Sequence, residues 1–488
     1  MAIRVYDTLK KEKVDFSPVE PGKVKMYLCG PTVYGFLHVG NFRGAIFFNV
    51  VRNWLEKRGY EVTYVYNYTD VDDKIIKRAN EEGVTSLDIS ERYIAEFEKD
   101  FARLNLRKHD HNPKVTEYMP QIITFIDELV QKGMAYVVDG EVFYEISKFD
   151  SYGKLSGKKL DDLEAGARVE IDQRKHSPAD FVLWKPAKPN EPSWDSPWGK
   201  GRPGWHIECS AMIQAILGST IDIHGGGIDL IFPHHENEIA QGEGHSGECY
   251  CNHWMHNNFI NFDNEKMSKS LGNIITGRSF MDKYNPEVLK FLMLSGHYRV
   301  QINFGQERIS QAIGGLSRIY VSLRDAETVA GDFEMDESLV DKSLIEMCNK
   351  ATANIAESLD DDFNTPEVLA QIFEVVRHYN GLNLVKKKKN ASNKSTSAYF
   401  KNWVVSSGEM MSLFQEAPSS FLAELDDILI TERNIDIDHI NKLINERNQA
   451  RADKNYQRSD EIRDELDKLG ILVMDGVEGR GWEVDKRS

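Results

Sequence analysis

The chain has 488 residues, enough for about three domains at roughly 150 residues each. Hydrophobic residues make up 41% and charged residues 28% of it, as in an ordinary globular enzyme, and no apolar run approaches the ~20 residues of a membrane span. The net charge of −17 argues against a dedicated, non-specific nucleic-acid binder, but a folded RNA could still be gripped by a local basic face.

The start of the chain and its cysteines bear on the compartment. The first residues, MAIRVYDTLKKEK, lack the apolar core of a secretion signal, so we expect a cytosolic protein with no membrane partner. In that reducing compartment a small, odd number of cysteines favours metal binding or plain burial over a disulfide framework. The five are Cys29, Cys209, Cys249, Cys251 and Cys348.

The stretch 24–67 has the pattern strand, loop, helix, strand. KVKMYL is apolar-rich, and EVTYVYNYT is rich in β-branched and aromatic residues. Between them, apolar residues from Phe42 to Leu55 recur at helical spacing, and Gly59 suits a C-terminal cap. This βαβ unit predicts a parallel sheet covered by helices, with ligands bound beyond the carboxyl ends of the strands. Cys29 and His38 fall at that end of the first strand.

The remaining pattern predicts the domain organisation. We expect a doubly wound α/β domain over residues 1–116 and 205–305, interrupted by a connective insertion at 117–204 whose Pro- and Trp-rich part is mostly loop. Apolar residues at helical spacing predict a helical bundle over 306–425, with the polar tract 386–397 as a solvated linker. Residues 426–488 are expected to form a small mixed α/β domain of two helices and short strands.

Two short motifs carry the chemistry. In FLHVGNF, His38 stands at a helix start, where free backbone N–H groups and the helix dipole can meet an anion, and Gly40 lets a ligand come close. KMSKS at 266–270 offers two lysines and two serines on a loop as a phosphate clamp. Each motif alone is equally compatible with a helix-start histidine or a solvated basic turn. Both together, in this order, favour phosphate chemistry.

These motifs resemble the signatures of a known enzyme class. His38-Val39-Gly40-Asn41 resembles the HIGH signature, with Asn41 in place of histidine, and Lys266–Ser270 matches the KMSKS signature of class I aminoacyl-tRNA synthetases. Longer stretches, among them MYLCGPTVY, NYTDVDDKIIKRA, RPGWHIECSAM, DIHGGGIDLIFPHHENEIAQ and LDDDFNTPEVL, are similar to the cysteinyl-tRNA synthetase family over nearly the whole chain. The resemblance implies a Rossmann-like catalytic domain in a monomer that activates L-cysteine with ATP and transfers it to tRNA(Cys).

The cysteines have three open interpretations from the residues alone. His234 and Glu238 are spaced i, i+4 on one helix face and could share a metal, and two thiolates would complete a Zn²⁺ site. Cys29 and Cys209 could instead be buried small side chains. A rival cluster lies close together in the sequence: His245, Cys249, Cys251 and His253. The resemblance favours Cys29, Cys209, His234 and Glu238 as the ligands of one Zn²⁺ per chain.

Zinc would explain how such an enzyme distinguishes cysteine from serine. A pocket shaped by packing alone discriminates isosteric side chains by a few kcal/mol at most. Zinc binds a soft thiolate strongly, whereas a serine hydroxyl stays protonated and is a weak ligand. We therefore expect the substrate sulfur to become a direct zinc ligand, which makes a separate editing domain unnecessary.

The resemblance also implies the other site residues. His206 and His224 could orient the zinc ligands or be satisfied core histidines. The cysteine pocket is assigned to Cys29, Thr69, Trp205, His224 and Asp229. ATP, with Mg²⁺, is assigned to His38, Gly40, Asn41, Gly225, Gly226, Gly227, Lys266, Ser268 and Lys269, and the catalytic residues among these are His38, Asn41, Lys266 and Lys269.

The tail is expected to bind the tRNA. Arg451, Tyr456, Asp460 and Asp475 match family positions that read the anticodon, where unpaired bases stack on aromatics and bond along their edges. A charged surface helix is the alternative. Two other functions are a ligase that joins cysteine to an amino sugar and a non-catalytic tRNA-binding paralogue. The chain length and the tail argue against the first, and the intact motif and metal-ligand residues argue against the second.

Overall fold

The computed structural model describes residues 2–159, 172–262, 265–266, 275–474 and 481–486. The chain divides into two compact units. The first holds Met1–Arg278, Gly296–Ile302 and Ala356–Thr365, and the second holds Ser279–Ser295, Asn303–Ile355 and Pro366–Ser488. Ser268, Lys269 and Asp475 lie outside the described residues, as do the other residues of the KMSKS motif after Lys266.

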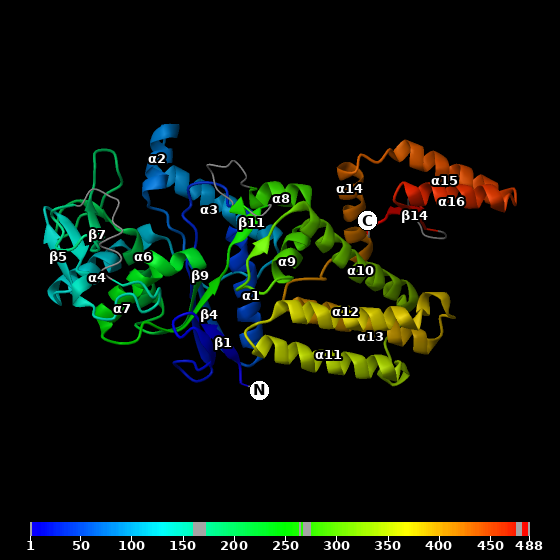
Figure 1. The fold of residues 1–488 in the computed structure, drawn as a ribbon, viewed down its shortest axis with the longest axis horizontal. Coiled ribbons are helices and arrows are strands. Elements are labelled where there is room, and N and C mark those ends of the chain that lie inside the picture. Colours follow the sequence, from blue (N-terminus) through cyan, green and yellow to red (C-terminus); the bar gives the residue numbers. More distant parts are fainter. Residues whose placement is uncertain (1, 160–171, 263–264, 267–274, 475–480, 487–488) are drawn as a thin grey trace. The chain divides into compact units, whose positions relative to one another are not determined.

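The first unit is built on a parallel sheet of four strands in the order β10-β9-β3-β4, which Figure 1 shows beside helix α1. The predicted βαβ unit is confirmed as β3 (Lys23–Leu28), α1 (Asn41–Lys57) and β4 (Glu61–Tyr66). β9 (Ile221–Gly227) and β10 (Cys251–Asn257) complete the sheet. The predicted parallel α/β class is therefore confirmed.

Helices cover both faces of this sheet. Successive residues of a strand point to opposite faces, so neighbouring residues of β3 contact different helices. Leu28 points toward Gly44 of α1. Tyr27, on the other face, lies in a buried cluster with Cys209 of α6 (Trp205–Ile216) and Ile239 of α7 (Glu236–Ser246). Helices α6 and α7 are thus held on one face, next to the carboxyl end of β3, although they come almost 200 residues later in the chain.

The other elements of the first unit surround this sheet and form the insertion. They are β1 (Arg4–Asp7), β2 (Glu12–Asp15), α2 (Asp73–Glu82), α3 (Ser86–Arg103), α4 (Met119–Gln131), β5 (Ala135–Val138), β6 (Glu141–Tyr144), β7 (Phe181–Pro186), β8 (Gly201–Pro203), β11 (Ile260–Phe262) and β12 (Glu265–Lys266). Short helical turns lie at Val115–Tyr118, Ile146–Lys148, Ile228–Leu230 and Ile231–His235. α8 (Gly277–Lys283), α11 (Lys342–Asp360) and β13 (Ile302–Asn303) have residues in both units, and so does α12 (Thr365–Leu382) through Thr365.

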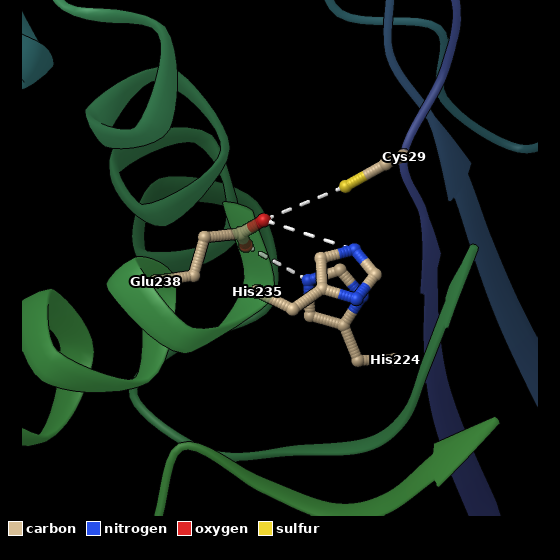
Figure 2. A group of neighbouring side chains, drawn as sticks. All are labelled: Cys29, His224, His235 and Glu238. Atoms are coloured by element: carbon tan, nitrogen blue, oxygen red, sulfur yellow. Dashed lines mark hydrogen bonds and ion pairs between the residues drawn. The ribbon is translucent and has the colours of Figure 1, made fainter. Parts of the chain in front are cut away.

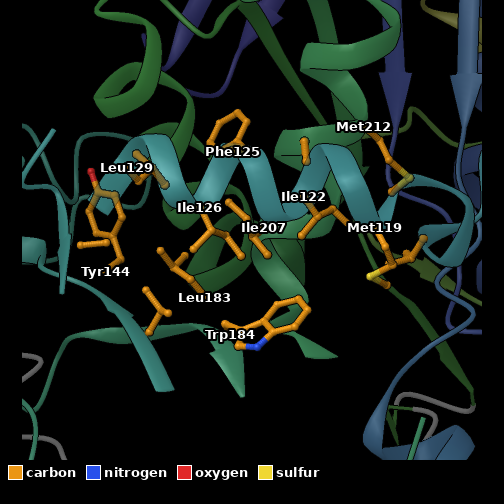
Figure 3. Close-up of a cluster of buried hydrophobic side chains, with 14 of the residues drawn as sticks. Met119, Ile122, Phe125, Ile126, Leu129, Tyr144, Leu183, Trp184, Ile207 and Met212 are labelled. Atoms are coloured by element: carbon orange, nitrogen blue, oxygen red, sulfur yellow. The ribbon is translucent and has the colours of Figure 1, made fainter. Parts of the chain in front are cut away.

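The insertion shares a core with α6, shown in Figure 3, where α4 and α6 pack around Trp184 and Leu183 of β7. Its strands form an antiparallel sheet in the order β5-β6-β7-β8. The Pro- and Trp-rich stretch is mostly loop, as predicted, but it also supplies β7 and β8. Both strands end in a proline, and Pro203 lies on the edge strand, where a missing N–H donor is tolerated.

The second unit is mainly helical, as the sequence predicts. Its elements are α9 (Pro286–Leu294), α10 (Gln306–Ala330), α12 (Thr365–Leu382), α13 (Ala391–Glu409), α14 (Pro418–Glu432), α15 (Ile437–Ala452), α16 (Tyr456–Lys468), β14 (Ile471–Val473) and β15 (Trp482–Val484), with short turns at Glu337–Leu339 and Leu384–Lys386. The tail has the two predicted helices and an antiparallel strand pair. Helix α14 runs across the predicted boundary at 425. Among the described residues, no helix has both the length and the apolarity needed to cross a membrane.

The predicted solvated linker at 386–397 is wrong for its second half, because α13 begins at Ala391. The side chain of Asn390 accepts a hydrogen bond from the Asn393 N–H and caps the helix. Three of the four hydroxyl residues in the tract, Ser395, Thr396 and Ser397, are buried. Their hydroxyls satisfy neighbouring groups; the Ser397 hydroxyl, for example, lies 2.8 Å from that of Tyr379. Polar composition therefore hid a helix with a satisfied polar face.

Candidate metal centre and nucleotide cleft

Four side chains that are distant in sequence meet at the carboxyl end of β3. Cys29 follows that strand, and Cys209 lies on α6. His234 lies in the short turn Ile231–His235 before α7, and Glu238 lies on the first turn of α7. Figure 2 shows Cys29 reaching toward Glu238 from the strand end. Cys209, His234 and Glu238 are buried, and Cys29 is partly exposed. All four predicted metal ligands are thus brought together.

The spacing of their donor atoms fits one tetrahedral ion. The sulfur of Cys29 lies 3.7 Å from that of Cys209, 3.5 Å from His234 Nε2 and 3.5 Å from Glu238 Oε1. His234 Nε2 lies 3.6 Å from the Cys209 sulfur and 3.0 Å from Glu238 Oε1. Ligand atoms about 2.0–2.3 Å from a shared tetrahedral ion stand roughly 3.3–3.8 Å apart. The chain therefore holds a possible Cys/His metal site.

The pKa shifts of Cys209 and Glu238 suit a cation, whereas burial raises the pKa of the Cys29 thiol well above its ordinary value. The hydrogen bond with Cys29 lowers the pKa of the Cys209 thiol to about 6 although burial opposes this. Burial disfavours charge on Glu238, yet His224 and His234 hold the pKa of its carboxyl well below the usual range. A metal takes thiolate and carboxylate ligands in their deprotonated forms. The group thus contains two donors already poised in the form that a metal binds.

A second set of donors shares two members with the first. It consists of Cys29, His224, His235 and Glu238, the residues drawn in Figure 2. His224 Nε2 lies 2.8 Å from Glu238 Oε2, but His235 Nε2 lies 4.0 Å from Glu238 Oε1. Because Cys29 and Glu238 belong to both sets, the two cannot each hold an ion. The first set has two thiols and the tighter spacing, so we favour it.

Two histidines contact the ligand side chains from outside. His206 Nδ1 lies 2.9 Å from His234 Nδ1, which leaves His234 Nε2 facing the other three donors. His224 contacts the second carboxylate oxygen of Glu238. These are the positions expected of groups that fix the tautomer and orientation of metal ligands. The rival cluster around Cys251 is not formed in the described part of the chain, where His245 pairs with Glu128 and Cys251 lies in the sheet.

A cavity of about 450 Å³ opens beside the metal-site residues. Trp205 stacks on the ring of His234, with 4.2 Å between ring centroids, and forms one wall. The predicted site residues that line the cavity are Cys29, His38, Gly40, Asn41, Trp205, Gly226, Gly227 and Asp229. Asn257, at the carboxyl end of β10, also lines it and was missed. The end of a parallel strand was the signal that could have found it.

Three predicted pocket residues lie behind the cavity wall. Thr69 is buried, and its hydroxyl donates to Glu208 at 3.4 Å. His224 is buried against Glu238. The prediction that Gly225 makes room for the nucleotide is wrong in this structure. A Cβ atom on Gly225 would lie 2.2 Å from the Phe48 ring, so this glycine instead allows α1 to pack on β9.

The start of α1 lies against the segment that follows the KMSKS motif. Val39 N donates to Ile275 O at 3.0 Å, and Gly277 N donates to Leu37 O at 2.8 Å. The fold thus brings residues 275–277, which follow the second motif in the chain, to the start of α1. The N–H groups of residues 41–43 already bond to the carbonyls of residues 38–40, contrary to the expectation of free donors. An anion here would be attracted by the helix dipole and by side chains.

The predicted anticodon residues lie on the last two helices. Arg451 is in the last turn of α15, and Tyr456, which begins α16, is 64% exposed. Asp460 of α16 pairs with Arg463 at 3.3 Å. An exposed aromatic ring at a helix start is available for stacking.

Family models match three regions of the chain. The class I (C) tRNA synthetase catalytic domain matches residues 15–314, the DALR domain matches 354–415, and the cysteinyl-tRNA ligase anticodon binding domain matches 438–482. These matches agree with a catalytic region followed by helical and anticodon-binding regions.

Curated relatives and solved structures are also similar. A cysteine–tRNA ligase of Bdellovibrio bacteriovorus is 52% identical over 99% of this chain and all of its own length, and one of Geotalea uraniireducens is 48% identical with the same coverage. A Mycobacterium tuberculosis methionyl-tRNA synthetase structure, 14% identical with a TM-score of 0.62, shares the fold over 82% of this chain and 93% of its own. The chain therefore belongs to the cysteine–tRNA ligase family of class I aminoacyl-tRNA synthetases.

Proposed function

We propose that this chain joins L-cysteine to tRNA(Cys) in two steps, with one zinc ion selecting the substrate thiol. The observation that carries the proposal is the largely buried Cys29, Cys209, His234 and Glu238 group beside a cavity that His38, Gly40 and Asn41 of the first motif also line. As a member of its family, the enzyme takes ATP, an amino acid and a tRNA as substrates.

The cysteine end of the cavity is formed by this chain's own side chains. Cys29, Cys209, His234 and Glu238 would hold the zinc ion. When bound, zinc supplies a soft Lewis acid that prefers a thiolate to a hydroxyl. Trp205 closes the pocket so that it suits a small side chain. Asp229 lines the cavity and would bind the substrate ammonium, and Thr69 would support this pocket from behind through Glu208.

In the first step, a cysteine carboxylate oxygen attacks the α-phosphorus of ATP. A carboxylate–phosphorus bond forms, the bond to the β-phosphate oxygen breaks, and pyrophosphate leaves with its Mg²⁺. His38 and Asn41 would hold the phosphates at the start of α1, where Gly40, Gly226 and Gly227 leave space for ATP. Lys266, Ser268 and Lys269 would neutralise the departing pyrophosphate. Catalysis then depends on positioning and charge stabilisation.

In the second step, a terminal ribose hydroxyl of the tRNA attacks the mixed anhydride and releases AMP. Recognition of the anticodon is assigned to Arg451, Tyr456, Asp460 and Asp475, and the exposed Tyr456 ring supports a stacking role.

We also propose the domain division 1–116 with 205–305, 117–204, 306–425 and 426–488, and a monomeric enzyme. Analytical ultracentrifugation tests the latter.

The function is tested by cysteine-dependent pyrophosphate exchange, metal analysis and charging of unfractionated tRNA. Exchange with cysteine, about one zinc per chain and cysteine-labelled tRNA are expected. Exchange followed by transfer to an amino sugar would identify the rival ligase, and tRNA binding without exchange would identify a non-catalytic paralogue. X-ray absorption at the zinc edge should gain one sulfur scatterer when cysteine is added; an unchanged spectrum would refute direct thiol ligation.

A further inference from the structure

One arginine of α1 is buried without an acidic partner. Arg43 lies two residues after Asn41, and its side chain is almost fully buried at 1% exposure. Among the ion pairs of the described residues, none includes Arg43. Burial lowers the pKa of its guanidinium only to about 10, so the group is charged at neutral pH. Burying a charge is costly unless its donors are bonded, so this arrangement needs an explanation.

The two terminal nitrogens of the guanidinium bond to backbone carbonyls of two segments, while its Nε is buried with no hydrogen-bond partner among the described residues. Nη1 donates to the carbonyls of Asn258 at 2.7 Å and Phe259 at 2.8 Å. Nη2 donates to the carbonyls of His297 at 3.2 Å and Val300 at 2.5 Å. Each terminal nitrogen therefore serves one segment. The planar fork of arginine can do this, whereas a single ammonium cannot reach both in the same way.

The two segments support each other and lead to the second motif. Asn258 N donates to Tyr298 O at 2.8 Å, and Ile302 N donates to Phe259 O at 3.2 Å. Residues 258–259 directly precede β11, which pairs with β12, and Asn261 is opposite Lys266 in that pairing. Arg43 is thus bonded to the base of the strand pair that carries Lys266, while its own helix begins at Asn41.

We propose that Arg43 is a positioning residue that fixes the β11–β12 strand pair against the start of α1, and so sets the relative placement of the two nucleotide-binding motifs. This inference rests on the proposed function, since it takes His38, Asn41, Lys266 and Lys269 as the residues around ATP. A misplacement of about 1 Å can cost on the order of 100-fold in rate, so the contact should matter for chemistry and not only for stability.

A second buried arginine of the same helix provides a matched control. Arg52 is 5% exposed and donates to Lys108 O, and it lies within 3.4 Å of Asp110 and Glu56. Among the described residues, the hydrogen-bond and ion-pair partners of Arg52 include no residue of the 258–259 or 297–300 segments. Substitution of Arg52 should therefore perturb α1 and its packing without moving the β11–β12 strand pair.

The test compares Arg43→Lys, Arg43→Met, Arg52→Lys and Arg52→Met in the full chain. For the Arg43 variants we expect kcat of pyrophosphate exchange to fall by about 10- to 100-fold, with KM for cysteine within about twofold and metal content unchanged. Amide hydrogen exchange in 258–262 should accelerate in the same variants. We expect the Arg52 variants to lower Tm by about as much as the Arg43 variants do. Their kcat should stay within about threefold of that of the unsubstituted enzyme.

Several outcomes would overturn the role. Equal loss of kcat at equal loss of Tm in the Arg43 and Arg52 variants would show a merely structural effect, as would unchanged hydrogen exchange at 258–262. If Arg43→Met does not fold, Arg43→Lys decides the question because it keeps the charge but not the fork. Absence of cysteine-dependent exchange in the unsubstituted enzyme would instead count against the proposed function, and hydrogen exchange would still decide whether Arg43 fixes the strand pair.

Discussion

Each unit of the molecule buries a glutamate, and the pKa values of Glu238 and Glu287 are shifted in opposite directions. Glu238 of the first unit contacts His224 and His234, which keep the pKa of its carboxyl well below the usual range despite burial. Glu287 of the second unit accepts hydrogen bonds from the Tyr320 hydroxyl at 2.9 Å and the Phe414 N–H at 2.6 Å. Burial raises the pKa of Glu287 to about 7, although Lys290 opposes the shift.

The difference shows that partners, and not burial, decide what a buried carboxyl can do. The imidazoles of His224 and His234 favour the anionic form of Glu238, which can bind a cation. Neutral donors around Glu287 satisfy its oxygens without requiring charge, so it acts as a polar link between α9, α10 and the segment before α14. Replacing glutamate by glutamine should therefore have different consequences at the two sites. At position 238 it should cause loss of bound metal, and at position 287 it should change the pH dependence of stability.

The largest effect is expected for Glu238→Gln. Glutamine keeps the shape but is a weaker metal ligand than a carboxylate, so we expect loss of bound metal and at least a ~100-fold fall in cysteine-dependent pyrophosphate exchange. Atomic emission and exchange kinetics measure the two effects. Glu287→Gln is the matched control and should retain metal. Full metal retention by Glu238→Gln would remove this residue from the ligand set.

Lys269→Ala should separate loss of chemistry from loss of metal. Removing a cation that meets the leaving pyrophosphate should slow adenylate formation by about 10²–10³-fold. Cysteine binding and metal content should be nearly unchanged, because the proposed ligands of the metal and of the substrate thiol do not include Lys269. Rapid-quench measurement of adenylate formation and equilibrium binding of cysteine test this. Equal losses in rate and in cysteine affinity would contradict the role.

A smaller effect is expected for His224→Gln. This change weakens the contact that orients Glu238 but leaves all four proposed ligands in place, so metal affinity should fall by about 10- to 100-fold. Competition with a chromophoric chelator measures the affinity. His253→Gln is the control. His253 is buried like His224, but it lies in β10 and accepts a hydrogen bond from the Ser17 N–H instead of contacting the metal group. Identical affinities in both variants would argue against an orienting role for His224.

The smallest effect is expected for Glu287→Gln, in the pH dependence of stability. The folded-state pKa of about 7 lies above the ordinary value of 4.5, so the folded protein holds a proton that the unfolded chain releases. The stabilisation that protonated Glu287 contributes to the folded protein is therefore fullest below pH 4.5. It is lost as pH rises toward 7, by up to about 3 kcal/mol. Thermal unfolding of the unsubstituted protein and of Glu287→Gln, measured from pH 5 to 8, should show a smaller change of stability with pH for the variant. Parallel profiles would show that Glu287 does not titrate in this range.

The local elements and their order could be predicted from the sequence. Periodicity identified the βαβ unit and the long helix α10, and turn chemistry placed the end of α1 near Gly59. Composition misled at Ser395–Ser397, because hydroxyl residues suit a linker or a satisfied helix face equally well. The role of Gly225 was also misjudged, since only the position of Phe48 on a neighbouring element explains why no side chain fits there.

What the sequence by itself determined was therefore local: helix and strand spacing, the two motifs, and the i, i+4 placement of His234 and Glu238. The tertiary structure alone decided that Cys29 and Cys209, 180 residues apart, stand 3.7 Å from each other, and that Arg43 bonds to carbonyls rather than to solvent. The physical reason is that periodicity reports which face of an element is buried, whereas the partners across that face are set by how distant elements pack.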